Sequence, residues 1–160
     1  MYSVNNVAGQ IGMVNRMDLL LLVALVLVVL AVNPILKIVT GVDTPLAVVR
    51  GCSMYPLLRQ GDLVIIVHKD PDDIRVGDII VYRSLKGHLI IHRVVAIIEV
   101  NGKYEYVTKG DHNPHDDSYL FEYPEGRGVP YSRVIGVVWR PFGVDFKIPY
   151  VGYLALLLGR

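Results

Sequence analysis

The chain has 160 residues, enough for one small domain and an anchor but too few for two independent hydrophobic cores. Lysine plus arginine total 16 against 15 for aspartate plus glutamate, a near-neutral balance that argues against a nucleic-acid partner. Cys52 is the only cysteine, which excludes an intrachain disulfide and a cysteine-ligated structural zinc site.

The amino-terminal part of the chain predicts a membrane anchor. Residues 1–18 form a short tail, and residues 19–37 are expected to be a transmembrane signal anchor, because no side chain from Leu19 to Val32 carries a polar atom. A cleavable secretory signal is the alternative, but the apolar run is longer than usual and no A-x-A-like site follows it. Weak charge asymmetry around Arg16 favours an amino terminus inside and a globular part outside.

Residues 45–145 have the pattern of a β-domain. Short apolar runs rich in Val, Ile and Tyr are bounded by Gly, Asp, Asn or Pro. The predicted strands are Leu46–Val49, Leu63–Val67, Ile79–Tyr82, Leu89–Val100, Tyr104–Thr108 and Val134–Trp139. We therefore expect a mainly β fold, a compact antiparallel sheet or partly open barrel behind one transmembrane helix.

Two of these strands follow the same kind of turn. Arg59–Asp62 precedes one strand and Arg75–Asp78 precedes another, and each turn has glycine at its third position. Glycine adopts turn conformations that other residues resist. The final residues, 146–160, are apolar and include two tyrosines. Either this tail lies at a membrane interface, or it is a last element packed on the β-core.

Three segments carry candidate chemistry. Ser53 lies in a tight segment directly after the first predicted strand. His92 lies in an aliphatic strand, where a part-buried, neutral imidazole can act as a general base. A polar loop from Thr108 to Asp117 could supply a carboxylate that orients this imidazole.

A metal site is the competing interpretation of the polar loop. Its four candidate ligands are Asp111, His112, His115 and Asp116. Their spacing matches no helical HExxH arrangement, and Pro114 breaks the local geometry, so neither a metal nor another cofactor is expected. Cys52 is a rival nucleophile, but alternate residues point in opposite directions in an extended chain, which favours Ser53 for facing His92.

Together these segments resemble the signal peptidase I family, in its archaeal and endoplasmic-reticulum branch. The resemblance runs from the anchor to Trp139, with Ser53-Met54-Tyr-Pro56 similar to the family's Ser-Met-x-Pro motif. The Gly77-Asp78 strand and the His92 strand are similar to two further motifs, the second of which carries the general base. That base is a lysine in the bacterial branch.

The polar loop completes the resemblance. Gly110-Asp111-His112-Asn113 is similar to the family's Gly-Asp-Asn loop, with His112 where Asn is usual, and Asp116-Asp117 matches the branch's Asp-Asp pair. The resemblance implies Ser53 as nucleophile, His92 as general base and Asp117 as orienter. Asp111 is a second candidate for a supporting role.

The resemblance also implies a function. We expect a membrane-bound serine endopeptidase that removes signal peptides from secretory preproteins, cutting after small residues. Membrane lipid is an expected partner, and the protein-export channel is a further candidate partner. The catalytic domain would face the extracytoplasmic side of the cell membrane or the endoplasmic reticulum lumen. The alternative is a membrane-tethered β-domain that binds peptides or export partners without cutting them. Substrate would bind as an added strand, and the strands beginning at Leu63 and Ile79 are expected to form its pockets.

Overall fold

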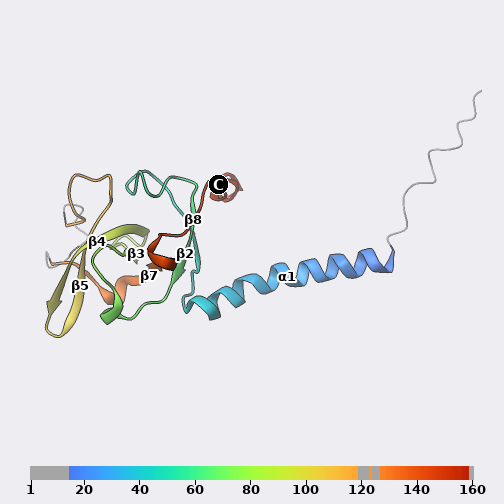
Figure 1. The fold of residues 1–160 in the computed structure, drawn as a ribbon, viewed down its shortest axis with the longest axis horizontal. Coiled ribbons are helices and arrows are strands. Elements are labelled where there is room, and N and C mark those ends of the chain that lie inside the picture. Colours follow the sequence, from blue (N-terminus) through green and yellow to red (C-terminus); the bar gives the residue numbers. More distant parts are fainter. Residues whose placement is uncertain (1–14, 119–122, 124–126, 159–160) are drawn as a thin grey trace, which may run out of the picture. The chain divides into compact units, whose positions relative to one another are not determined.

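The computed structural model describes residues 15–118, 123 and 127–158. It divides into two compact units, residues 1–36 and 37–160. The described residues of the first unit form most of α1 (Arg16–Thr40), and the second unit contains the β-domain (Figure 1).

Helix α1 is long and apolar enough to cross a membrane. Its 25 residues give a length of about 37 Å, which exceeds the roughly 30 Å hydrocarbon core of a bilayer. It is the one helix among the described residues that meets this condition. Its Leu and Val side chains from Leu19 to Leu30 are exposed, so only a membrane or another protein would remove them from water.

The β-domain is built from one antiparallel sheet. Its order is β1-β2-β7-β3-β4-β5-β6, with β8 also paired to β2. The strands are β1 (Leu46–Val48), β2 (Leu63–Val67), β3 (Ile79–Arg83), β4 (Leu89–Val100), β5 (Lys103–Lys109), β6 (Val129–Pro130), β7 (Val134–Val138) and β8 (Lys147–Ile148). The described pairs leave β1 and β6 at the two ends of this order. The predicted mainly β, antiparallel fold is confirmed, as an open sheet.

The six predicted strands all form, within a residue of their expected ends. The β4–β5 hairpin turns at Asn101 and Gly102, which have φ of 52° and 72°, the conformation for which an Asn-Gly pair is suited. The two-residue strands β6 and β8 and the helix α2 (Gly152–Leu158) were not predicted.

Two clusters of buried side chains hold the sheet together. The first is formed by Val42, Val49, Met54, Leu58, Val64, Ile66, Ile79, Val81 and Val138. The second is formed by Ile74, Ile80, Tyr82, Val94, Tyr106, Tyr123, Val129 and Val137. Successive residues of β3 belong to alternate clusters, because side chains of a strand point to opposite faces. β3 therefore has both faces covered, and its first four residues are buried.

The carboxyl-terminal segment packs on the β-domain in part. β8 pairs with β2, and the Gly152 N–H donates to the Gly61 carbonyl at 2.9 Å. Leu154 and Leu157 in α2 remain exposed. The beginning of the predicted apolar tail is thus a packed element, while contact of its exposed leucines with a membrane interface stays a prediction.

Candidate active site

Ser53 lies in a turn that the opposite loop fixes. The turn follows β1 and begins at Gly51, whose φ of +84° favours glycine. The Ser53 carbonyl accepts a hydrogen bond from the His112 N–H at 2.8 Å. A Cβ at Gly110 would lie 2.6 Å from that carbonyl oxygen and 2.8 Å from Asn113 Nδ2, so only glycine fits at this contact.

His92 is held in β4 with little access to water. It pairs with Ile80 of β3, and 4% of its surface is exposed. Its Nδ1 lies 2.8 Å and 2.7 Å from the two carboxylate oxygens of Asp117. Because a carboxylate only accepts hydrogen bonds, Nδ1 carries the proton in this pair, and Nε2 is the nitrogen left free to accept one.

Asp117 is fully buried at the centre of a hydrogen-bond network. Its Oδ2 accepts from Tyr82 OH at 2.8 Å and from Thr108 Oγ1 at 2.5 Å, in addition to His92. Its own N–H donates to the Thr108 carbonyl at 2.8 Å. A buried carboxylate needs such donors to remain charged, and together they fix the direction in which it meets His92.

Tyr123 supports this network through its hydrogen bonds to Thr108. The Tyr123 hydroxyl accepts from the Thr108 N–H at 2.6 Å and donates to the Thr108 carbonyl at 3.1 Å. Burial raises the pKa of the Tyr123 hydroxyl, so it stays protonated and able to donate near neutral pH. Thr108 is therefore held on its backbone as well as through its side chain.

Asp111 has a different partner. Its two carboxylate oxygens accept from Nε and Nη2 of Arg93, each at 2.8 Å, and Arg93 Nη1 donates to the Gly77 carbonyl at 2.7 Å. Hydrogen bonds to Asp111 raise the pKa of the Arg93 guanidinium. The structure thus brings Asp117, not Asp111, to His92. Asp111 ties the polar loop to Arg93 of β4, and Arg93 in turn binds the turn before β3.

The other polar-loop side chains also point to separate partners. The His112 ring meets Tyr55 edge-on, and Asp116 accepts hydrogen bonds from Ser118. In residues 15–118, 123 and 127–158, no three His, Cys, Asp or Glu side chains come together as metal ligands would.

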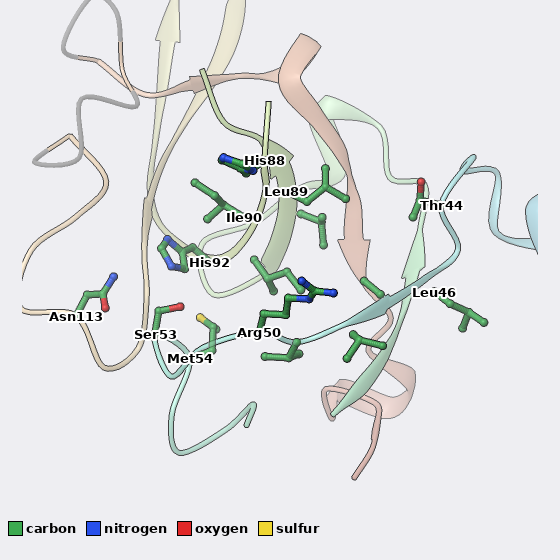
Figure 2. A pocket seen from close by; sticks show the side chains of 15 residues that line it. Thr44, Leu46, Arg50, Ser53, Met54, His88, Leu89, Ile90, His92 and Asn113 are labelled. Atoms are coloured by element: carbon green, nitrogen blue, oxygen red, sulfur yellow. The ribbon is translucent and has the colours of Figure 1, made fainter. Parts of the chain in front are cut away.

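Ser53 and His92 line the same pocket. Figure 2 shows the Ser53 hydroxyl and the His92 ring on one side of it, with Asn113 beside them. The pocket has a volume of about 680 Å³ and is otherwise lined mainly by apolar side chains of residues 46–49 and 89–91. Cys52 instead lines a separate depression with Tyr55, Arg59 and Tyr153. This separation agrees with Ser53, rather than Cys52, facing His92.

The two strands expected to form the substrate pockets contribute little to this pocket. Of the strands that begin at Leu63 and Ile79, only Val81 reaches it. Its walls are mainly β1 and the start of β4, with Val81 contributed by the strand that begins at Ile79, while no described residue of the strand that begins at Leu63 lines it. Those strands are needed for the core, where Val64, Ile66, Ile79 and Ile80 are buried. That the substrate binds in this pocket stays a prediction.

Comparison with known proteins gives the family. The family model described as Peptidase S24-like matches residues 30–114, which include Ser53, His92 and Asp111. The chain belongs to the Peptidase S24-like family. Similarity to individual relatives covers more of the chain than this family model does, 77–78% of its length.

Those relatives are named as catalytic subunits of signal peptidase complexes, in agreement with the family that the Ser53, His92 and polar-loop motifs resemble. The chain is 34% identical over 125 residues to the signal peptidase complex catalytic subunit SEC11C of Homo sapiens and equally to that of Mus musculus. It is 32% identical over 128 residues to the catalytic subunit SEC11 of Chaetomium globosum, covering 70% of that protein. It spans 62% of the length of the SEC11C relatives. The resemblance drawn from the sequence motifs is thereby confirmed.

Sequence reasoning misses three residues of this S24-like site. Tyr82 and Thr108 donate to Asp117, and Tyr123 holds Thr108. Tyr82 lies 35 positions from Asp117 and meets it through the pairing of β3 with β4 and of β4 with β5, whose Thr108 binds Asp117. The one available signal is that a buried Tyr usually hydrogen-bonds through its hydroxyl group, which leaves the partner unknown.

Proposed function

We propose that this chain is a membrane-bound serine endopeptidase that removes signal peptides from exported preproteins, cutting after small residues. The observation that carries the proposal is the buried His92–Asp117 pair, at 2.7 Å, whose His92 lines the same pocket as Ser53. The names of the relatives, catalytic subunits of signal peptidase complexes, support the choice of substrate.

In the proposed mechanism, His92 Nε2 takes the proton of Ser53 Oγ as the oxygen attacks the scissile carbonyl carbon. Asp117 keeps the Nδ1–H of His92 in place and stabilises the imidazolium that forms. His92 then protonates the leaving amine, and water hydrolyses the acyl-enzyme with His92 again as base. Tyr82 and Thr108 position Asp117 and do not touch the substrate.

The tetrahedral intermediate needs hydrogen-bond donors for its oxyanion. The Ser53 backbone N–H is one candidate. The Asn113 side-chain amide is the second, since it lines the pocket beside Ser53 and its Nδ2 is packed against Gly110. Asn113→Ala is then expected to lower kcat by about 10²-fold with little change in KM. An unchanged kcat in steady-state kinetics would exclude Asn113 as a donor.

The pocket suits a substrate bound as an extended strand. In the described pairs, β1 pairs with β2 only, and residues 89–92 of β4 pair with β3 only, because the pairing of β4 with β5 begins at Arg93. Each therefore presents one unpaired edge, and both line the pocket. The buried side chains of Met54 and Val81 form part of its lining, which favours small substrate side chains at the cut.

We further propose that α1 anchors the protein in the cell membrane with the β-domain on the extracytoplasmic side. An anchored enzyme meets its substrate on one surface, which raises their effective concentration. Membrane lipid and the protein-export channel are the proposed partners there. Protection of the β-domain from protease added outside intact cells would contradict this orientation.

The test is cleavage of a membrane-inserted preprotein by the purified chain, with sequencing of the new amino terminus. Wild type is expected to cut after a small residue, while Ser53→Ala and His92→Ala are folded and inactive. Full activity in Ser53→Ala would refute the mechanism. Peptide binding by all three proteins without cleavage would favour the binding-domain alternative.

A further inference from the structure

Arg50 places a positive charge in the pocket that holds Ser53. It follows β1 and precedes the Gly51 turn, and its exposed side chain lines the pocket. Figure 2 shows Arg50 extending along the pocket between Ser53 and Leu46. The side chain thus lies beside the path of a strand bound along β1.

No acidic side chain is found among the described residues that line this pocket. Its other polar lining residues are Thr44, Ser53, His88, His92 and Asn113, and the rest of the lining is apolar. Among the described residues, no hydrogen bond or ion pair engages the Arg50 guanidinium. Its charge therefore acts on whatever enters the pocket, and the apolar walls screen it less than open water would.

We infer that Arg50 is a specificity-determining residue that favours an aspartate or glutamate, and disfavours a lysine or arginine, in the peptide segment bound in this pocket. The inference rests on the proposed function, because it takes the pocket as the site of the substrate strand. A guanidinium pairs with a carboxylate through two parallel hydrogen bonds, which makes the discrimination directional as well as electrostatic.

A lipid phosphate is another anion that a guanidinium can bind. The pocket favours a peptide because two strand edges bound it, those of β1 and of residues 89–92, which no other described strand pairs with on that side. A peptide backbone can satisfy the N–H and C=O groups of such edges. A phosphate headgroup would leave those edges unpaired and the apolar walls uncovered. Vesicle binding separates the two sources.

The experiment measures peptide binding to the full-length Ser53→Ala protein in neutral detergent. The probes are fluorescent signal-peptide fragments that carry Asp, Asn or Lys at successive positions before the cut and are otherwise identical. At one or two positions, the Asp peptide is expected to bind roughly three to ten times more tightly than the Lys peptide. The ratio should fall toward one as salt rises, because the guanidinium is exposed.

Charge reversal supplies the decisive comparison. Adding Arg50→Glu should invert the order, so that the Lys peptide binds more tightly at those positions. Lys103→Glu is the matched control, since it makes the same change in net charge on an exposed residue of β5 outside this pocket. It should leave the preference unchanged.

Three results would overturn the inference. They are equal binding of Asp and Lys peptides at every position, an unchanged preference in Arg50→Glu, and an equal shift in Lys103→Glu. Loss of anionic-vesicle binding in Arg50→Glu without a peptide preference would assign the residue to lipid instead. The Arg50 inference is tested by peptide binding, whereas the proposed function is tested by cleavage. The proposed function fails if the wild-type protein binds these peptides but does not cut them.

Discussion

At the scale of single residues, two of the three aspartates of the polar loop, Asp111 and Asp117, have different roles. Asp117 is buried and meets His92, whereas Asp111 is partly exposed and pairs with Arg93. Asp117→Asn replaces an acceptor-only carboxylate with an amide that can hold the imidazole in the wrong tautomer. We expect kcat to fall by about 10³-fold to 10⁴-fold, with the fold retained.

Asp111→Asn is the matched control for that substitution. It weakens a partly exposed ion pair and should cost about 1 kcal/mol of stability with little loss of kcat. Kinetics and thermal unfolding on both variants check the difference. Equal losses of kcat in the two variants would contradict the view that Asp117, and not Asp111, acts in catalysis through its contact with His92.

The sequence supports Ser53, His92 and Asp117 as candidates because each stands in a recognisable local motif. Sequence alone does not decide between Asp117 and Asp111, since both are carboxylates in one loop. The choice depends on the packing of Thr108 and Tyr82 around Asp117, which the strand register sets. Contacts between distant positions leave no local pattern by which Tyr82 could be found.

At the scale of elements, the two Gly-containing turns share one design. In each, the aspartate carboxylate accepts the N–H of the arginine three positions earlier, Asp62 from Arg59 at 3.0 Å and Asp78 from Arg75 at 2.9 Å. Each aspartate also accepts from a lysine, Lys147 for Asp62 and Lys69 for Asp78. The glycines have φ of 86° and 98°.

The two glycines differ in their surroundings, which gives a matched pair. A Cβ at Gly61 would lie 2.3 Å from the Tyr153 ring of α2, whereas a Cβ at Gly77 meets nothing within 4 Å. Gly77→Ala should lower the free energy of unfolding by about 1 kcal/mol through backbone strain alone. Gly61→Ala should lower the free energy of unfolding further and should speed proteolysis within α2, because the Tyr153 ring must move. Equal costs, measured by chemical unfolding, would show that α2 does not pack there.

The Asp62–Lys147 pair predicts a loss of stability in acid. Burial of Asp62 acts to raise its pKa, but hydrogen bonds from Lys147 and from the Arg59 N–H outweigh it and lower the pKa below 3.8. A lowered folded pKa means that this contribution is present above the unfolded pKa and is lost as pH falls through the folded one. Unfolding followed between about pH 5 and pH 2 should show a shallower acid loss in Lys147→Met than in wild type. Parallel curves would contradict the pairing.

Strands and turns of this domain follow from local sequence, because alternating Val and Ile runs and Gly turns act over a few residues. β6 and β8 escape prediction since two residues give no periodicity. The pairing of β8 with β2 and the docking of Gly152 on Gly61 depend on segments far apart in the chain.

At the scale of the whole molecule, the chain combines an apolar helix with a domain that has its own core. Residues 37–160, produced without the anchor, should fold and cut a short soluble peptide with a kcat/KM within about twofold of the full chain, since the site lies within this unit. Cleavage of a membrane-inserted preprotein should fall by at least about 10²-fold, because the shared surface is lost. Equal rates on the inserted preprotein would show that the anchor does not serve catalysis.

The most direct test of the central claim is the identity of the acylated residue. A peptide ester is mixed with the wild-type chain, the reaction is quenched in acid, and the protein is digested and sequenced by mass spectrometry. The acyl group is predicted on Ser53, with none in His92→Ala. An acyl group on Cys52, or a Ser53→Ala protein that still forms the adduct and turns over, would contradict a Ser53–His92–Asp117 endopeptidase.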